Sequence, residues 1–160
     1  MKIECTLSSA SLANAAEQLR KYADSLTGKT EKLVQSLGEY GVERANEHLE
    51  HDDTGETRSS IQYTHEGTSG TVSVGGAAVW IEFGTGVIAN KGNSPHPKRD
   101  EVGAVPWGEY GHGLGKRRWW FINRKGEKKW TAGIPINPFM YMAAQDMRSE
   151  LLKKAKEVFK

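Results

Sequence analysis

The 160-residue chain has little of three things: cysteine, net charge and long apolar runs. Cys5 is the only cysteine, which excludes an internal disulfide and any zinc site that needs two thiolates from one chain. The formal net charge of +2 is too small to predict nucleic-acid or membrane binding by itself. No apolar run approaches the ~20 residues of a membrane-spanning helix, and the first residues lack the apolar segment of a signal peptide. We therefore expect a protein that is made and folded in a reducing cytoplasm and has no membrane partner.

Hydrophobic residues are also scarce, at 37% of the chain, whereas glycine is frequent, at 18 residues. The length suffices for one domain with a core but not comfortably for two. We expect a single domain over 1–160, with a thin core and a loop insertion at about 87–131. This composition is typical of a protein that completes its order within an assembly.

Apolar residues at spacings of three and four predict helices in the first third of the chain. One such stripe covers 11–26 and another covers about 30–51. These are either two helices separated at Gly28 or one long bent helix. Gly38 and Gly41 lie in the second stripe, where each costs roughly 1 kcal/mol against alanine unless it lets another backbone approach closely.

Alternation of apolar and polar residues predicts short strands. The run at 2–7 is the first, with Cys5 as a buried thiol on its inward side. The runs at 58–65 and 71–75 flank a glycine-containing turn and predict a β-hairpin.

The segment 80–86 places three large apolar side chains around one carboxylate and ends in a glycine-containing turn. Residues 77–83 lead into it as a third strand or a short helix. Glu82 lies either on the exposed face of a strand or in the interior with a partner, because a buried carboxylate without one is costly. The segment consists of Trp80, Ile81, Glu82, Phe83, Gly84, Thr85 and Gly86.

A second motif, Asp53-Thr54-Gly55, follows the polar end of the second helical stripe. We expect an Asx-type turn in which the Asp53 carboxylate accepts backbone N–H groups and Gly55 relieves the bend. Arg58 then faces a carboxylate, which we expect to be Glu82, within or between subunits. The alternative is that Arg58 and Glu82 are both solvated surface charges.

From 87 to 116 no periodicity survives, and a loop of ~30 residues is more often functional than inert. It contains Trp107 and Tyr110. The runs at 117–123 and 128–131 then predict a second hairpin that projects from the body. Its basic and aromatic residues alternate as in a platform for single-stranded nucleic acid, but also as in a docking surface for an acidic partner or a neighbouring subunit. A solvated hairpin with a buried aromatic face and positive charge facing DNA in a lumen are further alternatives. The residues concerned are Arg117, Arg118, Trp119 and Trp120.

The chain closes with a helix from Pro138 to about residue 159. Asn137 suits the N-cap of this helix and Pro138 suits its first position. We expect Phe139 to pack in the core against Phe83, with a contact to another subunit as the alternative.

The motifs give little support to a catalytic function. Asp53-Thr54-Gly55 has the letters of an aspartic-protease turn, but it follows a polar helix end rather than an apolar strand. His48, His51 and the two following aspartates have the spacing of a metal cluster, but also that of a solvated helix end. No serine or cysteine has a context for nucleophilic activation. We expect no catalysis, metal, cofactor or small-molecule substrate.

The order of the motifs resembles the gene-product-ten-like tail-component family of long-tailed bacteriophages over nearly the whole chain. The insertion around Gly108–Lys116 looks like the form common in phages and prophages of Gram-positive hosts. The apolar or proline residue that the family usually has before Asp-Thr-Gly is replaced by His51-Asp52. The matching motifs are Asp53-Thr54-Gly55-x-x-Arg58-x-Ser60-Ile61, segment 80–86, and Asn137-Pro138-Phe139-Met140-Tyr141-x-Ala143.

The resemblance implies an α+β fold in which an N-terminal helical region and a C-terminal helix pack on a small antiparallel sheet. It implies a structural virion protein, made in the bacterial cytoplasm, whose identical subunits form a ring in the neck. The expected partners are the head connector and the tail tube or tail terminator, with non-specific contact to DNA in the lumen. A different class of function, a small nucleic-acid-binding module that uses the hairpin at 116–125, is the alternative.

Overall fold

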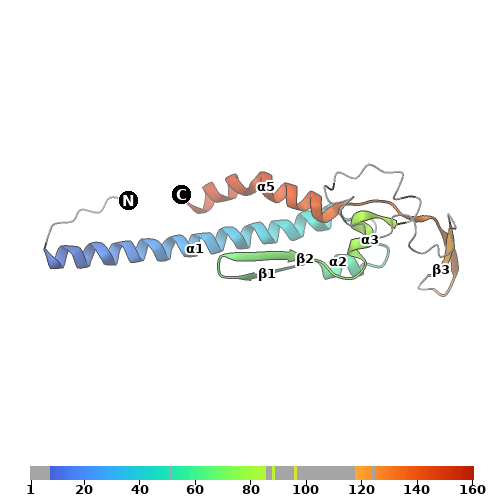
Figure 1. Cartoon of the computed structure of the whole chain (residues 1–160), viewed down its shortest axis with the longest axis horizontal. Helices are drawn as coiled ribbons and strands as arrows, with labels where there is room; N and C mark the ends of the chain where they lie inside the picture. The colour runs from blue at the N-terminus through green and yellow to red at the C-terminus, as the bar shows by residue number, and fades with distance from the viewer. Residues whose placement is uncertain (1–7, 51, 86–87, 89–95, 97–117, 124) are drawn as a thin grey trace.

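The computed structural model describes residues 8–50, 52–85, 88, 96, 118–123 and 125–160. The fold is α+β, as predicted from the sequence. The molecule is elongated, and one long helix, α1 (Ser9–His48), runs along it (Figure 1). The C-terminal helix α5 (Phe139–Val158) lies beside the C-terminal half of α1. A hairpin of β1 (Gln62–Glu66) and β2 (Ser69–Ser73) also lies against α1.

Several predictions concern residues outside this described set. They are the strand at 2–7 with Cys5, His51, Gly86, Arg117, and the loop at 87–116 with Trp107 and Tyr110, apart from Ile88 and His96.

Helix α1 is continuous over 40 residues, which decides between the two helical alternatives. The side chain of Thr27 donates to the carbonyl of Ala23 at 3.3 Å, and that of Thr30 donates to the carbonyl of Leu26 at 2.9 Å. The polar residues around the expected break therefore bond back along the helix and do not end it. The helix ends at His48, a few residues before the predicted position.

Gly38 and Gly41 are buried and admit two side chains, whereas the sequence suggested the approach of a backbone. A Cβ atom on Gly38 would lie 2.1 Å from Cε2 of Tyr63, which comes from β1. A Cβ atom on Gly41 would lie 2.5 Å from Sδ of Met147, which comes from α5. The two glycines thus let the hairpin and α5 pack closely on α1.

We expect Gly38→Ala to destabilise the chain by about 1–3 kcal/mol, because its methyl group would overlap the Tyr63 ring. Gly28→Ala is the matched control, since no atom lies within 4 Å of its Cβ position and alanine favours the helix by roughly 1 kcal/mol. Urea unfolding of both variants measures the two effects. Equal stabilisation by the two substitutions would contradict the packing described for Gly38.

A short helix, α2 (Glu56–Ser60), occupies the start of the run at 58–65 that we expected to be a strand. The strand β1 therefore begins only at Gln62, although the hairpin itself is confirmed, with Tyr63 opposite Val72. The expectation fails because alternation over 58–60 is too short to outweigh a capped helical turn. Residues 78–83 form a helix, α3 (Ala78–Phe83), which settles the alternative left open there.

The second hairpin is confirmed as β3 (Trp119–Ile122) and β4 (Lys128–Thr131), at the far end of the molecule from the start of α1 (Figure 1). Asn123 holds its turn, because its side-chain oxygen accepts the backbone N–H groups of Lys125 at 3.0 Å and Glu127 at 2.9 Å. The two hairpins are separate sheets in the described residues, which agrees with the expected small antiparallel sheet and a second, separate hairpin.

The core lies where the ends of the helices meet. Phe139 has no exposed surface, which confirms its expected place in the core. Phe83 is buried beside this cluster, with its ring edge-on to that of His96 at 4.7 Å between centroids. No helix in the described part of the chain has the length and apolar character to cross a membrane. The core cluster consists of Ala45, Leu49, Ile61, Ala78, Ile81, Phe139 and Ala143.

Candidate functional site

The polar residues of the sequence motifs meet where α1, α2, α3 and α5 come together. Four of them, Asp52, Arg58, Glu82 and Asn137, bind backbone groups at the ends of helices, and Glu82 and Asn137 do so from distant parts of the chain. We call this region the motif junction.

Asp52 caps α2. One carboxylate oxygen accepts the backbone N–H of Arg58 at 2.7 Å, and the other accepts that of Thr57 at 3.4 Å. We expected Asp53 in this role, and that expectation is wrong, because the residue one earlier has the reach to the first turn of α2. Gly55 has φ of 71°, so its expected role in the bend is confirmed, and the Thr54 hydroxyl accepts the N–H of Glu56 at 3.2 Å.

Arg58 binds the C-terminal end of α1 and does not pair with Glu82 in the same chain. Its guanidinium donates to the carbonyl of Asn46 at 2.6 Å and to that of Leu49 at 2.8 Å. A cation at this place is favourable, because the last carbonyls of a helix carry partial negative charge. The predicted ion pair within the chain is therefore wrong, since backbone carbonyls take the place of the expected carboxylate.

Glu82 caps α5 from a segment nearly 60 residues earlier. Its two carboxylate oxygens accept the backbone N–H groups of Met140 at 2.9 Å and Tyr141 at 3.0 Å. The residue is buried, and His96 Nε2 lies 3.9 Å from one oxygen. Burial raises the pKa of Glu82, although the two backbone hydrogen bonds oppose that rise. Its interior position was one of the two alternatives, but its partner is a helix end.

Asn137 holds α1 and does not cap α5. Its buried side chain donates to the carbonyl of His48 at 2.9 Å and accepts the N–H of Glu50 at 2.9 Å. Its backbone N–H donates to the carbonyl of Ile81 at 2.9 Å. The N-cap position belongs to Pro138, which has no side-chain hydrogen bond to offer, so Glu82 supplies the cap. We expected Asn137 at the N-cap and Pro138 at the first helical position, but Pro138 is the N-cap and Phe139 begins the helix.

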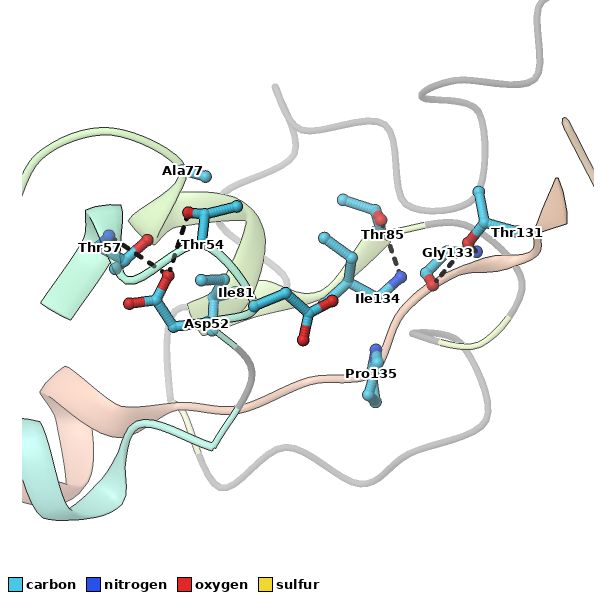
Figure 2. Close-up of a pocket in the computed structure, with 11 residues that line it drawn as sticks. Asp52, Thr54, Thr57, Ala77, Ile81, Thr85, Thr131, Gly133, Ile134 and Pro135 are labelled. Atoms are coloured by element: carbon cyan, nitrogen blue, oxygen red, sulfur yellow. Dashed lines mark hydrogen bonds between the residues drawn. The ribbon is translucent and has the colours of Figure 1, made fainter. Parts of the chain in front are cut away.

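The end of segment 80–86 joins the strand that leads to α5. Gly84 has φ of 71°, a left-handed conformation that suits glycine. Thr85 is buried and its hydroxyl accepts the N–H of Ile134 at 3.0 Å (Figure 2). Ile134 belongs to the short strand β5 (Gly133–Ile134), which pairs with Thr85. Trp80 is half-buried on α3.

A pocket of about 460 Å³ opens on the motif junction (Figure 2). Its walls come from the turn before α2, from the start and middle of α3, and from the strand that joins β4 to α5. Apolar side chains form much of the wall, and the Asp52 and Asp53 carboxylates and four threonines add polar groups. The lining residues are Asp52, Asp53, Thr54, Thr57, Ala77, Ile81, Thr85, Thr131, Gly133, Ile134 and Pro135.

A separate polar cluster links α1 to α5 and was not expected. One Asp146 oxygen lies 2.6 Å from Nε of Arg44 and 2.7 Å from Nε2 of His48, and Arg44 also pairs with Glu47. Hydrogen bonds from His48 and Arg44 lower the pKa of Asp146. The spacing of Arg44 and His48, four residues apart on one face of a helix, was the available signal for a shared acidic partner.

We expect Asp146→Asn to cost on the order of 1 kcal/mol at neutral pH and almost nothing in acid, because the pair is partly exposed. The pKa of Asp146 is lower in the folded chain than its ordinary value of 3.8. Its contribution to stability is therefore full above that value and is lost as pH falls through the folded pKa. Urea unfolding of both proteins over a pH series measures the difference. A gap that widens toward low pH would contradict the assignment.

The β3–β4 hairpin presents exposed aromatic side chains. Trp120 and Trp130 face each other across the strands and are 50% and 65% exposed. Lys128 Nζ lies 4.2 Å from the centroid of a Trp120 ring, within the range of a cation–π contact. Ile122, on the same strand as Trp120, is also exposed. Of the four expected residues here, Arg118 is exposed and Trp119 lies in β3.

The arrangement favours a structural use of the motif residues. The carboxylates of Asp52 and Glu82 accept backbone N–H groups at helix ends, so both are committed to capping. Within the described residues, no three His, Cys, Asp or Glu side chains gather as a metal site would require. No protein-family model, curated protein or solved structure matches the chain.

Proposed function

We propose that the chain is a structural subunit of the head–tail junction of a long-tailed bacteriophage, where identical copies form a ring between the head connector and the tail. The resemblance in motif order supports this assignment. The use of the motif residues supports it as well, because Asp52, Arg58, Glu82 and Asn137 bind helix ends. Side chains whose polar groups are already bonded to helix ends suit a structural subunit better than a catalyst. The protein's place is then the neck of the virion.

The observation that carries the proposal is the amount of apolar surface left uncovered. Among the described residues, eight apolar side chains are buried, whereas twelve large ones are exposed. Soluble monomers rarely leave large apolar patches in water, so such surface marks places where other proteins bind. In the part of the chain that the structure describes, more large apolar side chains are exposed than buried, which suits a protein that assembles.

Helix α1 shows this most clearly. Its N-terminal half extends beyond α5 and the β1–β2 hairpin (Figure 1). Leu12, Leu19 and Leu26 recur every seven residues, and Leu33 continues the series. Leu12 and Leu19 are 52% and 56% exposed, and Tyr22 is also exposed. We call Leu12, Leu19 and Tyr22 the α1 stripe, and we propose that a neighbouring subunit covers it, because a heptad spacing is what helix pairs use.

Deletion of the gene in the phage or prophage that carries it tests the assignment. We expect DNA-filled heads and complete but separate tails, since the joining ring is missing. Adding the purified chain to the separated heads and tails should restore joined particles. A deletion mutant that still yields joined, infectious particles would refute the proposed role.

A second candidate is a small nucleic-acid-binding module that uses the β3–β4 hairpin. The specific observation is the exposed Trp120–Trp130 pair with Lys128 over one ring, an arrangement on which bases can stack. Titration of single-stranded DNA at several salt concentrations separates the two candidates. Tight binding that weakens steeply with salt and is lost in Trp120→Ser favours the module. Weak DNA binding that is unchanged by Trp120→Ser would favour a protein as the partner of the hairpin.

A further inference from the structure

Two surfaces at the same end of the molecule have complementary chemistry. One is the pocket at the motif junction, with Ala77, Ile81, Ile134 and Pro135 among its apolar walls and the carboxylate of Asp53 beside them. The other is the exposed face of the β3–β4 hairpin, formed by Trp120, Ile122, Lys128 and Trp130, which we call the aromatic face. The pocket is apolar with acidic groups, and the aromatic face is apolar with a basic group.

The two tryptophans of the aromatic face are not enclosed by the described part of their own chain. Trp130 immediately precedes Thr131, which lines the pocket, yet 65% of Trp130 is exposed. Trp120, across from it, is half exposed. Among the described residues, both indoles therefore remain available to another molecule, and the pocket lies beside the base of their hairpin.

We propose that the aromatic face of one copy docks into the motif-junction pocket of the next copy. This inference rests on the proposed ring and names the contact that closes it. A ring of identical subunits needs two different surfaces on each subunit that fit each other, and the pocket and the aromatic face are such a pair.

Size and charge both favour this occupant. The volume of about 460 Å³ lies within the ~300–1,000 Å³ of pockets that enclose a ligand, which is room for an indole ring and part of its strand. Lys128 Nζ lies 4.2 Å from the centroid of the Trp120 ring. A hairpin that inserts Trp120 into the pocket therefore also brings an ammonium group near the carboxylate of Asp53. An aromatic anchor in a pocket with a charge pair near its edge is the usual form of a dominant interface contact.

The proposal explains why the motifs surround this pocket. The turn at Asp52 and Asp53, helix α3 and the strand at Thr85 and Ile134 all contribute to its wall. The capping bonds of Asp52 and the Thr85–Ile134 bond fix the positions of those walls before any partner arrives (Figure 2). The docking surface is thus preformed, which lowers the cost of ordering it on assembly.

Two full-length variants test the contact from its two sides. Trp120→Ser with Trp130→Ser removes the aromatic face but keeps the pocket. Ala77→Trp fills the pocket but keeps the aromatic face, and Ala77 is an exposed lining residue with no capping bond to lose. We expect each variant to need roughly 10–100-fold more protein for half-assembly, the effect of losing a central tryptophan contact. Mass photometry measures assembly, and circular dichroism checks the fold.

In an equimolar mixture of the two variants the docking contact can form in only one way, between the pocket of one variant and the aromatic face of the other. We therefore expect species of two chains in the mixture at concentrations where each variant alone remains a single chain. If Ala77→Trp does not fold, Asp53→Lys replaces it, because Asp53 is exposed. In that case Asp53→Lys combined with Lys128→Glu should recover most of the assembly that either change alone removes.

The outcomes separate this inference from the proposed function. If the wild-type chain assembles and all of these variants assemble equally well, the inference is overturned and the ring uses other surfaces. If the wild-type chain stays single at every concentration and the mixture gives no two-chain species, both the docking contact and self-assembly fall. If the hairpin variant assembles normally but loses DNA binding, the aromatic face serves nucleic acid and the inference is overturned.

Discussion

Glu82→Leu is expected to destabilise the folded chain by about 2–5 kcal/mol. The leucine side chain fits an apolar interior, but it cannot accept the N–H groups of Met140 and Tyr141, which Glu82 binds at 2.9 and 3.0 Å. An orphaned buried N–H costs about 1–3 kcal/mol, and two are left at the start of α5. Chemical unfolding followed by circular dichroism measures the loss. A stability within a few tenths of a kcal/mol of wild type would contradict the capping role.

Glu82→Gln is the matched control, because glutamine has the same shape and keeps one acceptor oxygen. We expect about half the loss seen for leucine. The pH dependence gives a second readout, because burial raises the pKa of Glu82 above its ordinary value of 4.5. A raised folded pKa means that this contribution is full below that value and declines as pH rises through the folded pKa. The stability of wild type relative to Glu82→Gln should therefore fall as pH rises across that interval.

Replacing Leu12 and Leu19 together by serine is expected to weaken self-assembly strongly while leaving the fold intact. Both side chains are more than half exposed, so the single chain loses little when they are removed. In the proposed assembly they lie against a neighbouring subunit, and burying each leucine contributes about 1.5–3 kcal/mol. Two such losses raise the concentration needed for assembly by roughly 100-fold or more.

The control for this variant lies on the other face of the same part of α1. Glu17 and Lys21 form an exposed ion pair at 3.6 Å, and exposed pairs contribute little. Glu17→Ser with Lys21→Ser changes as many residues without touching the α1 stripe. We expect it to assemble like wild type in sedimentation-velocity runs. Equal loss in both variants would mean that the helix, rather than its apolar stripe, was disturbed.

Local patterns predicted the elements that depend on neighbouring residues. The hairpin at 62–73, the hairpin at 119–131 and the closing helix all follow from alternation, turn residues and apolar spacing. The core position expected for Phe139 at the start of the closing helix is also confirmed. The strand expected over 58–60 is wrong because the carboxylate of Asp52, just before α2, accepts N–H groups of its first turn and favours a helical turn there.

The partners at the motif junction were not predictable in this way. The sequence indicated that Glu82 is either buried with a partner or exposed. It also indicated that Arg58 faces a negatively charged group, so an ion pair between the two was the simplest inference. The folded chain instead gives Arg58 the carbonyls at the end of α1 and gives Glu82 the N–H groups at the start of α5. The partial charges at helix ends belong to backbone groups, not to side chains. An argument that pairs charged residues by sequence therefore overlooks them.

The central claim is that this chain is a building block that binds copies of itself through uncovered apolar surface. The native mass of the purified full-length chain, measured from nanomolar to tens of micromolar, tests it most directly. We predict a single closed species whose mass is a whole multiple of 17.7 kDa and which dissociates to single chains on dilution. A mass of 17.7 kDa at every concentration would contradict the account.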